Sequence, residues 1–485
     1  MNYLSIDVGT TACKCQLFSE DGDILDYITK EYSLKYIDGF ACADITAIRE
    51  NVLSMIKAVA CKHKIDSICI STFGETFVAL DKEDNILFDP MLYLMDKRGE
   101  EQAKQISAMF GNEYVFRTTG TVPHTMYSVS KLLWVKENKP NIYQKIDKVL
   151  LICDYLGYVL TGKRVIDYSL AARTGVFDIR ELRFSHEMCH KLGIKEEWFS
   201  VPYRAGHIVG KVVNRELALE DCTLVLGAHD QVCTALGAGI IEENRAVDGM
   251  GTVECITAVY RGPKEDVRMG EQGYTCIPYA VDGLYCTYIV NYSSGLLINW
   301  FKNDILHSYK GEADNVFSYL EKGMKNEPTG IYVLPYFAGA MIPYQDVNAK
   351  GAIIGLTAST TDSQIYQAIM EGLSMEMCFE SSITEKYGIC VRSAVATGGG
   401  ANSKKWLQLK ADIQGIPYAT LRSSEGGLCG CAVLQAVAGG KTFRDAVKIF
   451  VKIKDKFSPN RDRAALYAPF YGKYKDLYKS VKEFY

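Results

Sequence analysis

A turn of small residues interrupts the apolar run at the start of the sequence. Asp7 is followed by Gly9, Thr10 and Thr11, and a strand-like pattern resumes beyond them with Lys14. Glycine lets a backbone amide come close to a phosphate, and the threonines add hydroxyl and amide donors. Asp7 could hold a hydrated Mg²⁺, which usually takes one or two protein carboxylates, and Lys14 could reach a phosphate as a point charge. A tight hairpin turn has the same composition, so this pattern alone leaves both interpretations open.

The same device recurs near the middle of the chain. Gly251 and Thr252 follow a strand-like pattern, residues 246–250, and precede a further strand-like pattern that ends at residue 260. Two facing Gly-Thr hairpins would grip a triphosphate from two sides. Taken alone, the second turn is more typical of an ordinary strand connection.

Three consecutive glycines, residues 398–400, lie between a strand pattern and a helical pattern. Each glycine loses conformational entropy on folding, so a run of them needs a reason, and close approach of a flat ligand such as adenine with its ribose is one. On this interpretation Gly399, Gly400 and Asn402 contact the ligand. A second glycine run opens a later helical pattern, where it indicates either ligand contact or close helix packing: Gly426, Gly427 and Gly430.

Two acids stand among turn residues next to apolar elements. Asp230, followed by Gln231, begins an apolar helical pattern, where it could act as a general base toward a hydroxyl or simply cap the helix. Glu75, preceded by Gly74, follows a buried strand pattern and is either a surface turn residue or a hydroxyl acceptor in a cleft.

Composition excludes several other classes of protein. The chain has 485 residues, a net charge of −4 and scattered basic residues, so it indicates neither a nucleic-acid nor a membrane partner. The 16 cysteines stand singly in apolar stretches, as buried free thiols do, and fit a reduced cytoplasm. Its start lacks a signal-peptide pattern, and no segment is as long and apolar as a membrane helix. Motifs of serine hydrolases, zinc proteases and Walker-type loops are not found.

Hydrophobic periodicity places these residues on a duplicated α/β fold. Strand, Gly-Thr turn and strand at residues 3–18, followed by a third strand at 24–32, are echoed at residues 246–260 and 284–292. Helical patterns cover residues 45–61, 129–138, 363–385 and 403–415, and strand patterns cover 66–72 and 391–397. The length favours at least two domains, which we place at residues 1–243 and 244–485.

Together these motifs resemble the FGGY carbohydrate kinases, the family of glycerol, xylulose, ribulose, fuculose and gluconate kinases, in the right order over essentially the whole chain. Two further segments carry the resemblance. The mid-chain signature is similar to residues 131–138, with Lys131, Trp134, Glu137 and Asn138, and the later one to residues 351–371, with Gly351, Gly355, Gln364 and Glu371.

The resemblance implies an α/β fold of two actin-like, ribonuclease-H-like domains around a central cleft. It implies an ATP-dependent kinase that uses Mg²⁺ and phosphorylates a hydroxyl of a small sugar or polyol in the cytoplasm, and it leaves a homodimer open. Asp230 would take the hydroxyl proton and Asp7 would help to bind Mg²⁺. The implied nucleotide contacts also include Gly295, while the implied substrate contacts are Gly74, Glu75, Asp96 and Gln231.

The substrate positions depart from any one member of the family. Xylulose kinases usually carry Gln-Met-His where this chain has Phe73, Gly74 and Glu75, and of the Arg-Glu-Thr of glycerol kinases only the Glu-Thr pair remains. Gln231 is like glycerol kinases, and His229 before Asp230 is like deoxysugar kinases. Asp96 and Arg98 keep the Asp-x-Arg of xylulose kinases without the preceding Trp-Asn, which is Leu94-Met95 here. A xylulose-like ketose, a glycerol-like polyol and a deoxyketose therefore all stay open.

Two other classes of function compete with a kinase. An actin- or Hsp70-like nucleotide-driven interaction protein shares the fold and the phosphate hairpins but needs no carboxylate base facing a sugar. A catalytically silent, sugar-binding regulator would be expected to have lost Asp230 or one of the two hairpins, and all three are present.

Overall fold

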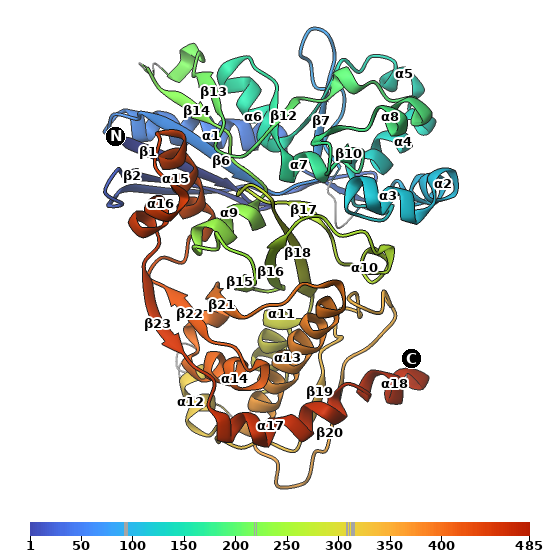
Figure 1. Ribbon diagram of the computed structural model, residues 1–485, viewed down its shortest axis with the longest axis vertical. Helices are drawn as coiled ribbons and strands as arrows, with labels where there is room; N and C mark the ends of the chain where they lie inside the picture. The colour runs from blue at the N-terminus through green and yellow to red at the C-terminus, as the bar shows by residue number, and fades with distance from the viewer. Residues whose placement is uncertain (92–95, 218, 220, 307–308, 310, 312–315) are drawn as a thin grey trace.

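The computed structural model describes residues 1–91, 96–217, 219, 221–306, 309, 311 and 316–485. Two mixed sheets, one in each half of the chain, form its framework (Figure 1). The first has the order β13-β14-β6-β1-β2-β3. Its strands are β1 (Asn2–Val8), β2 (Ala12–Ser19), β3 (Ile24–Glu31), β6 (Ser67–Thr72), β13 (Ile208–Lys211) and β14 (Thr223–Val225).

The second sheet has the order β17-β18-β16-β15-β21-β22-β23. Its strands are β15 (Arg245–Met250), β16 (Glu254–Arg261), β17 (Ile277–Pro278), β18 (Leu284–Asn291), β21 (Ser393–Thr397), β22 (Tyr418–Leu421) and β23 (Ile453–Phe457). In both sheets an antiparallel hairpin is extended by a third antiparallel strand on one side, and by two parallel strands and a last antiparallel one on the other. The second sheet has the short strand β17 in addition, paired with β18 at its edge. The matching order confirms the expected duplicated, actin-like α/β fold.

Shorter elements surround the first sheet. Its helices are α1 (Ile45–Ala60), α2 (Glu100–Phe110), α3 (Asn112–Thr119), α4 (Ser128–Asn138), α5 (Pro140–Tyr143), α6 (Ile152–Thr161), α7 (Tyr168–Ala172), α8 (His186–Leu192) and α9 (Asp230–Gly237). Paired short strands lie among them: β4 (Lys35–Ile37) with β5 (Phe40–Cys42), β7 (Phe77–Leu80) with β8 (Lys148–Leu151), β9 (Val165–Asp167) with β12 (Val201–Tyr203), and β10 (Phe177–Asp178) with β11 (Arg183–Phe184). Among these helices the sequence patterns predicted α1, α4 and α9 individually, and they predicted none of the short strand pairings.

The second half of the chain contributes the remaining helices that the structure describes. They are α10 (Val267–Glu271), α11 (Ser294–Trp300), α12 (Val316–Lys322), α13 (Asp362–Thr384), α14 (Lys404–Gln414), α15 (Gly426–Ala438), α16 (Phe443–Phe450), α17 (Arg461–Tyr474) and α18 (Leu477–Val481). The strands β19 (Tyr332–Leu334) and β20 (Ala352–Ile354) pair beside them.

Helix α15 belongs to the second half of the sequence but packs against α9 and strands β1 and β6 of the first (Figure 1). Glycines make this possible: a Cβ on Gly237 would lie 1.9 Å from the Gly426 carbonyl oxygen, and one on Gly430 would lie 2.0 Å from that of Cys233. Close helix packing therefore accounts for Gly237 and Gly430, whereas a Cβ on Gly426 would meet nothing nearer than Cγ2 of Thr234, at 3.2 Å. The predicted boundary at residues 243/244 falls just before β15 and stays a prediction.

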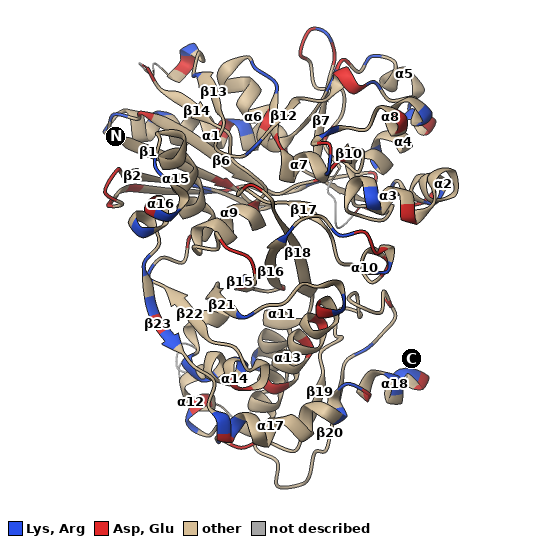
Figure 2. Ribbon diagram, viewed as in Figure 1, with Lys and Arg blue, Asp and Glu red and all other residues tan. Residues whose placement is uncertain are grey.

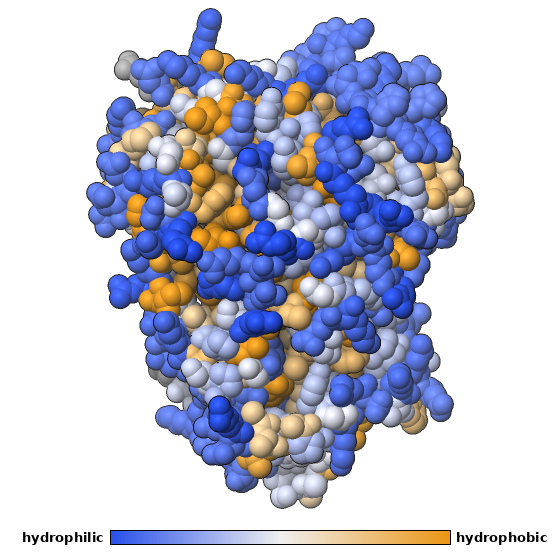
Figure 3. All heavy atoms as spheres, viewed as in Figure 1, coloured by the Kyte–Doolittle hydropathy of each residue, from blue (hydrophilic) through white to orange (hydrophobic). Residues whose placement is uncertain are grey.

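Buried apolar side chains fill both halves. Adjacent residues of β1, which point to opposite faces, are both buried, as Leu4 and Ile6 on one face and Tyr3 on the other show. Hydrophilic side chains cover most of the face in Figure 3. Within the described ranges, no helix has the length and apolar character that spanning a membrane requires.

Candidate functional site

The first Gly-Thr turn joins β1 to β2 and keeps Asp7 at the end of β1. The amide of Gly9 donates to the Ala12 carbonyl at 2.9 Å, and the Tyr32 hydroxyl donates to the Gly9 carbonyl, so the turn is held from both sides. Oδ1 of Asp7 is buried and has no hydrogen-bond partner. Burial raises the pKa of Asp7 to about 6, against the opposing effects of Ser71 and Lys14.

This unpaired oxygen meets the main requirement of a Mg²⁺ site. Mg²⁺ is usually held by one or two carboxylates together with waters and phosphate oxygens, rather than by a cage of protein ligands. Across the residues that the structure describes there is no cluster of three or more His, Cys, Asp or Glu side chains able to hold a metal. Asp7 beside the bare start of α15, where a Cβ on Gly427 would lie 3.2 Å from Oδ1, fits such a sparse site.

Lys14 stands opposite Asp7 across the hairpin, but its ammonium is already engaged. It pairs with Glu425 at 3.0 Å, with 36% of the Lys14 side chain and 24% of the Glu425 side chain exposed. Glu425 immediately precedes α15, so this pair ties β2 to that helix. Contact between Lys14 and a phosphate would require the pair to part.

The second Gly-Thr turn joins β15 to β16 and rests on the start of α11. The amide of Gly295 donates to the Gly251 carbonyl and that of Leu296 to the Thr252 carbonyl, both at 3.1 Å. A Cβ on Gly295 would lie 2.4 Å from the Gly251 oxygen, so this close packing already requires glycine there. Gly251, Thr252 and Val253 themselves are exposed.

A buried ion cluster supports this turn from inside. Lys410 of α14 lies between Asp248 and Glu254, 2.9 Å from an Asp248 oxygen and in direct contact with Glu254, and all three side chains are fully buried. Ser294 donates to the remaining Glu254 oxygen at 2.6 Å. Residues at both ends of the turn are thereby joined to α14 and α11.

In the glycine loop before α14 only one glycine faces open space. A Cβ on Gly400 would lie 2.8 Å from the Met250 Cβ and 2.9 Å from Trp406, whereas one on Gly399 would meet nothing within 4 Å. Gly399 and Asn402 bound a short 3₁₀ turn and are exposed. Packing therefore accounts for Gly400, and Gly399 is the position a flat ligand could approach.

Asp230 is the first residue of α9, and the residue that caps the helix is His229. The structural alternative for Asp230, that it serves as the N-cap, is therefore wrong. Its side chain is 31% exposed, and Nδ1 of His229 lies 3.2 Å from Oδ1. Burial together with the negative charges of Asp7 and Glu75 raises the pKa of Asp230 to about 7. Next to it, Gln231 accepts a 3.5 Å hydrogen bond from Thr257 of the second sheet.

Glu75 is not a surface turn residue but is buried, with a backbone φ of +63°. Its carboxylate pairs with Arg173, which follows α7 and is also buried. Burial raises the pKa of Glu75, and the Arg173 charge acts in the opposite direction. Sequence reasoning missed Arg173, because a single arginine at a helix end carries no local signal of a partner 98 residues away.

Asp96 is buried, and its carboxylate is bound by Arg98. Lys131 of α4, fully buried, donates to the Asp96 backbone carbonyl at 2.8 Å, and burial lowers the Lys131 pKa to about 8. The Asp-x-Arg spacing thus reports an internal ion pair. Leu94 and Met95, noted in the sequence, lie outside the described residues.

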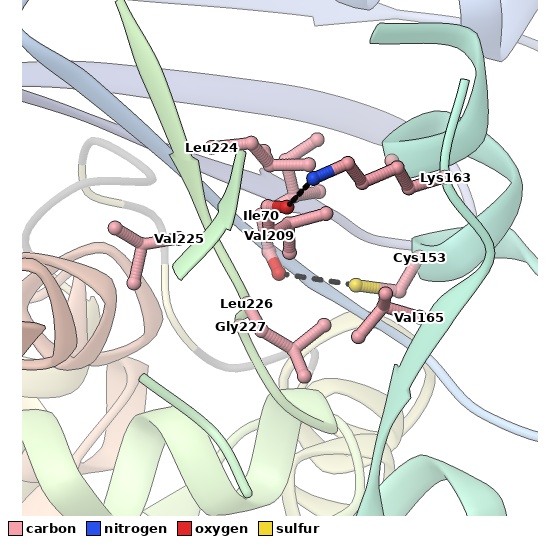
Figure 4. Close-up of a pocket in the computed structure, with 10 residues that line it drawn as sticks. Ile70, Cys153, Lys163, Val165, Val209, Leu224, Val225, Leu226 and Gly227 are labelled. Carbon is pink, nitrogen blue, oxygen red and sulfur yellow. Dashed lines mark hydrogen bonds between the residues drawn. The ribbon is translucent and has the colours of Figure 1, made fainter. Parts of the chain in front are cut away.

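Charge interactions link Asp230 to Asp7 and Glu75. Gly74 lies close to the His229 ring, and Gln231 is bonded to Thr257, so these predicted residues lie around one region between the two sheets. Asp96 is connected to Glu75 through the charge of Lys131. A cavity elsewhere does not belong to this site. It has a volume of about 10 Å³ and lies between β6, α6 and β14. Figure 4 shows Lys163 and Cys153 at its edge donating to the carbonyls of Val209 and Ile70, so its polar side chains are already paired.

Family models match most of the chain. The N-terminal domain model of the FGGY family of carbohydrate kinases matches residues 2–237, and the C-terminal domain model matches residues 249–439. Among similar proteins, a xylulose kinase of Staphylococcus epidermidis is 27% identical over 99% of this chain and 97% of its own length. A gluconokinase of Bacillus subtilis is 26% identical over 96% of this chain and 93% of its own.

Solved structures share the fold. A ligand-bound xylulose kinase from Lactobacillus acidophilus superimposes with a TM-score of 0.90 at 24% identity, covering 99% of this chain and 98% of that one. A glycerol kinase from Plasmodium falciparum with ADP does so with a TM-score of 0.88 at 22% identity, covering 99% and 98%. With both family models matched in order along nearly the whole length, the chain belongs to the FGGY family of carbohydrate kinases.

Proposed function

We propose that this protein transfers the γ-phosphoryl group of MgATP to a hydroxyl of a small sugar or polyol, with Asp230 as the general base. The observation that supports it best is the position of Asp230. This carboxylate is partly exposed, has a pKa near 7 and lies beside His229, within electrostatic range of Asp7, Glu75 and Arg173. A base with a pKa near the working pH is matched to removing a hydroxyl proton.

The roles of the other residues follow from their surroundings. Asp7 would hold Mg²⁺ through its unpaired Oδ1, and the ion when bound would neutralise charge on the phosphates. The Gly9–Thr10–Thr11 and Gly251–Thr252 turns would present amides and hydroxyls to the phosphates. Gly399 would leave room for adenosine, with Asn402 at its edge.

Asp230 would act once the sugar hydroxyl lies next to it. The hydroxyl oxygen attacks the γ-phosphorus as its proton passes to the Asp230 carboxylate, and ADP leaves on the opposite side. Asp230 then returns the proton to water. Excluding water during this step prevents wasteful hydrolysis of ATP.

A coupled assay of ADP release tests the proposal. The purified protein is given MgATP with a panel of polyols, ketoses, deoxysugars and aldonates, and ATP without any acceptor serves as the background. At least one acceptor is expected to raise ADP release well above background, and to yield a phosphate ester detectable by mass spectrometry. ATP binding without transfer to any acceptor would favour a nucleotide-driven interaction protein or a silent regulator instead.

A further inference from the structure

We infer that Arg173 and Glu75 form one donor–acceptor pair that selects a neutral acceptor carrying two neighbouring oxygens, such as a polyol or a ketose, over an aldonate. The inference rests on the proposed function, and it assigns a substrate contact to Arg173. It begins from two buried polar atoms that the folded chain leaves without partners.

Each member of the pair uses only part of its hydrogen-bonding capacity on the other. Arg173 donates from Nε, and contacts Glu75 also through Nη2, whereas its Nη1 has no hydrogen-bond partner. Oε1 of Glu75 accepts from Arg173, whereas Oε2 has no partner. A buried polar atom left unpaired costs about 1–3 kcal/mol. A free donor on one member of the pair and a free acceptor on the other are the complement of a hydroxyl next to another oxygen.

The surroundings hold the pair in place. The guanidinium of Arg173 lies over the rings of Tyr127 and Tyr288, with its carbon 5.2 Å and 5.7 Å from the ring centres. The two side chains are only 5% and 1% exposed. A planar guanidinium flanked by aromatic rings keeps a fixed orientation, which a flexible ammonium would not.

The backbone beside Glu75 is shaped to admit the guanidinium. A Cβ on Gly74 would lie 3.0 Å from Cγ of Arg173 and 2.9 Å from the His229 ring, so a larger residue would displace one of them. Glu75 itself has a φ of +63°, an uncommon backbone conformation for glutamate. Strained residues that persist in buried positions are concentrated at ligand sites.

The pair is connected to the proposed base through Tyr288 and His229. The His229 ring stacks on Tyr288 with ring centres 5.6 Å apart, and the Tyr288 hydroxyl is 3.2 Å from Nδ1 of His229. The same Nδ1 is 3.2 Å from Oδ1 of Asp230. A substrate that meets Arg173 and Glu75 would thus have a further hydroxyl within reach of Asp230.

Charge decides the class of substrate. The charge of Arg173 is balanced by Glu75, so the pair offers no net positive charge to a carboxylate. An aldonate carboxylate at this place would face the free Glu75 oxygen and be repelled. A neutral hydroxyl can donate to that oxygen while its neighbour accepts from Nη1. An analogue lacking one of the two oxygens leaves a buried group unpaired, which sites of this kind discriminate strongly against.

The test compares kcat/KM for a neutral acceptor, its deoxy analogue and the matching aldonate. Wild type is expected to prefer the neutral acceptor by about 100-fold or more, equivalent to ~2.7 kcal/mol. Glu75→Gln and Arg173→Lys should each narrow these ratios at least tenfold, with the KM for ATP within twofold. Arg180→Lys, a change at a partly exposed arginine that pairs with Glu265, should leave the ratios unchanged.

Equal losses on all three acceptors in both variants would overturn the inference, because a purely structural pair cannot change ratios. Preference of wild type for the aldonate would overturn it as well. If no acceptor in the panel is phosphorylated, the proposed function fails, and the inference about Arg173 and Glu75 is then tested by binding alone. A rise in the wild-type melting temperature with the neutral acceptor but not with the aldonate supports the inference. A rise with the aldonate alone, or no rise with either compound, refutes it. If the variants do not fold, the same binding measurement on the wild-type protein tests the inference.

Discussion

The two Gly-Thr hairpins occupy equivalent places in the two sheets, but their charges are arranged differently. In the first, Asp7 stands two residues before Gly9 and keeps an unpaired oxygen. In the second, Gly249 stands two residues before Gly251, in the position equivalent to Asp7. The nearby acids of the second hairpin, Asp248 and Glu254, are fully buried and bound to Lys410.

This difference suggests that the first hairpin takes part in the chemistry, whereas the second mainly supports the structure. In the first hairpin the unpaired oxygen belongs to a carboxylate that no buried lysine among the described residues neutralises, and the proposed base, Asp230, lies in the same half of the chain. In the second hairpin Asp248 also keeps one unpaired oxygen, but its other oxygen is bound by the fully buried Lys410, so this carboxylate already has its cation. Figure 2 shows several acidic residues along α13 of that half. The two copies of the duplicated fold therefore have different roles.

The largest expected effect is on the free energy of unfolding, and it comes from replacing the lysine beside each hairpin. Lys410→Met leaves two buried carboxylates without their cation, and we expect it to lower the free energy of unfolding by about 3–5 kcal/mol. Lys14→Met removes a partly exposed pair and should cost no more than about 1 kcal/mol. Urea unfolding of both variants measures the difference.

Equal losses from the two lysine variants would break the comparison. If Lys410→Met does not fold, adding Asp248→Asn and Glu254→Gln removes the unpaired charges and should restore much of the stability. Failure of that triple variant to fold would indicate that packing, rather than charge, anchors the second hairpin.

Asp7→Asn should remove the free carboxylate of the first hairpin. Because charge stabilisation by a metal contributes several kcal/mol to such a transfer, we expect kcat to fall about 100-fold or more and the Mg²⁺ requirement to rise. Titration of kcat with MgCl₂ measures both. Asp26→Asn, at the surface pair with Lys62, is the control and should be unchanged. Normal Mg²⁺ dependence in Asp7→Asn would remove Asp7 from the metal site.

Asp154, in the first half of the chain, offers a comparison with the cluster around Lys410, because its carboxylate is buried without a neighbouring lysine or arginine of the described residues in an ion pair. Asp154 accepts from Ser200 at 2.5 Å, and burial raises its pKa to about 8. The folded state therefore retains a proton that the unfolded state has lost, so stability should fall between about pH 4 and pH 8, by up to ~1.4 kcal/mol per pH unit.

The isosteric Asp154→Asn variant should lack this component of the pH dependence. From pH 6 to pH 8 its unfolding free energy is expected to gain roughly 2 kcal/mol relative to wild type. Urea unfolding at several pH values measures this gain. Parallel stability curves for the two proteins would mean that Asp154 is already ionised when folded.

The smallest expected effect is on the KM for ATP, and it concerns Gly399 in the loop before α14. Gly399→Val places a side chain in open space and should raise the KM for ATP about tenfold, or ~1.4 kcal/mol, with little change in the sugar KM. Gly400→Val is the contrasting variant, since it would clash with Met250 and Trp406 and lower stability instead. An unchanged ATP KM in Gly399→Val would place adenosine elsewhere.

Local patterns predicted much of this architecture. Alternating apolar residues around Gly9 and Gly251 located both hairpins, and the strand pattern at residues 24–32 located β3. The helices from residue 45 and residue 403 begin within two residues of their predicted starts. These features depend on neighbours in the chain, which a sequence displays directly.

Features that depend on distant neighbours escaped prediction. Arg173 is unremarkable in sequence and acquires its role only when α7 brings it over Gly74. Lys14 has the type and position of a phosphate ligand, yet Glu425, over 400 residues away, binds it in the folded chain. Gly295 was expected to contact nucleotide, and the structure shows a packing requirement that sequence could not distinguish from it. The type of a residue suggests which interactions it can make, and only the folded structure shows which partner it contacts.

The proposed base gives the most direct test. Asp230→Asn keeps the shape of the side chain and removes its basicity, so kcat is expected to fall about 10²–10⁴-fold. Because Asp230 works as a carboxylate, wild-type kcat/KM should rise with pH through about 7, and the residual activity of the variant should lack that rise. Nucleotide affinity and melting temperature, measured on the same preparation, should be close to wild type, since His229 rather than Asp230 caps α9. A folded, nucleotide-binding variant with kcat within threefold of wild type would contradict the account.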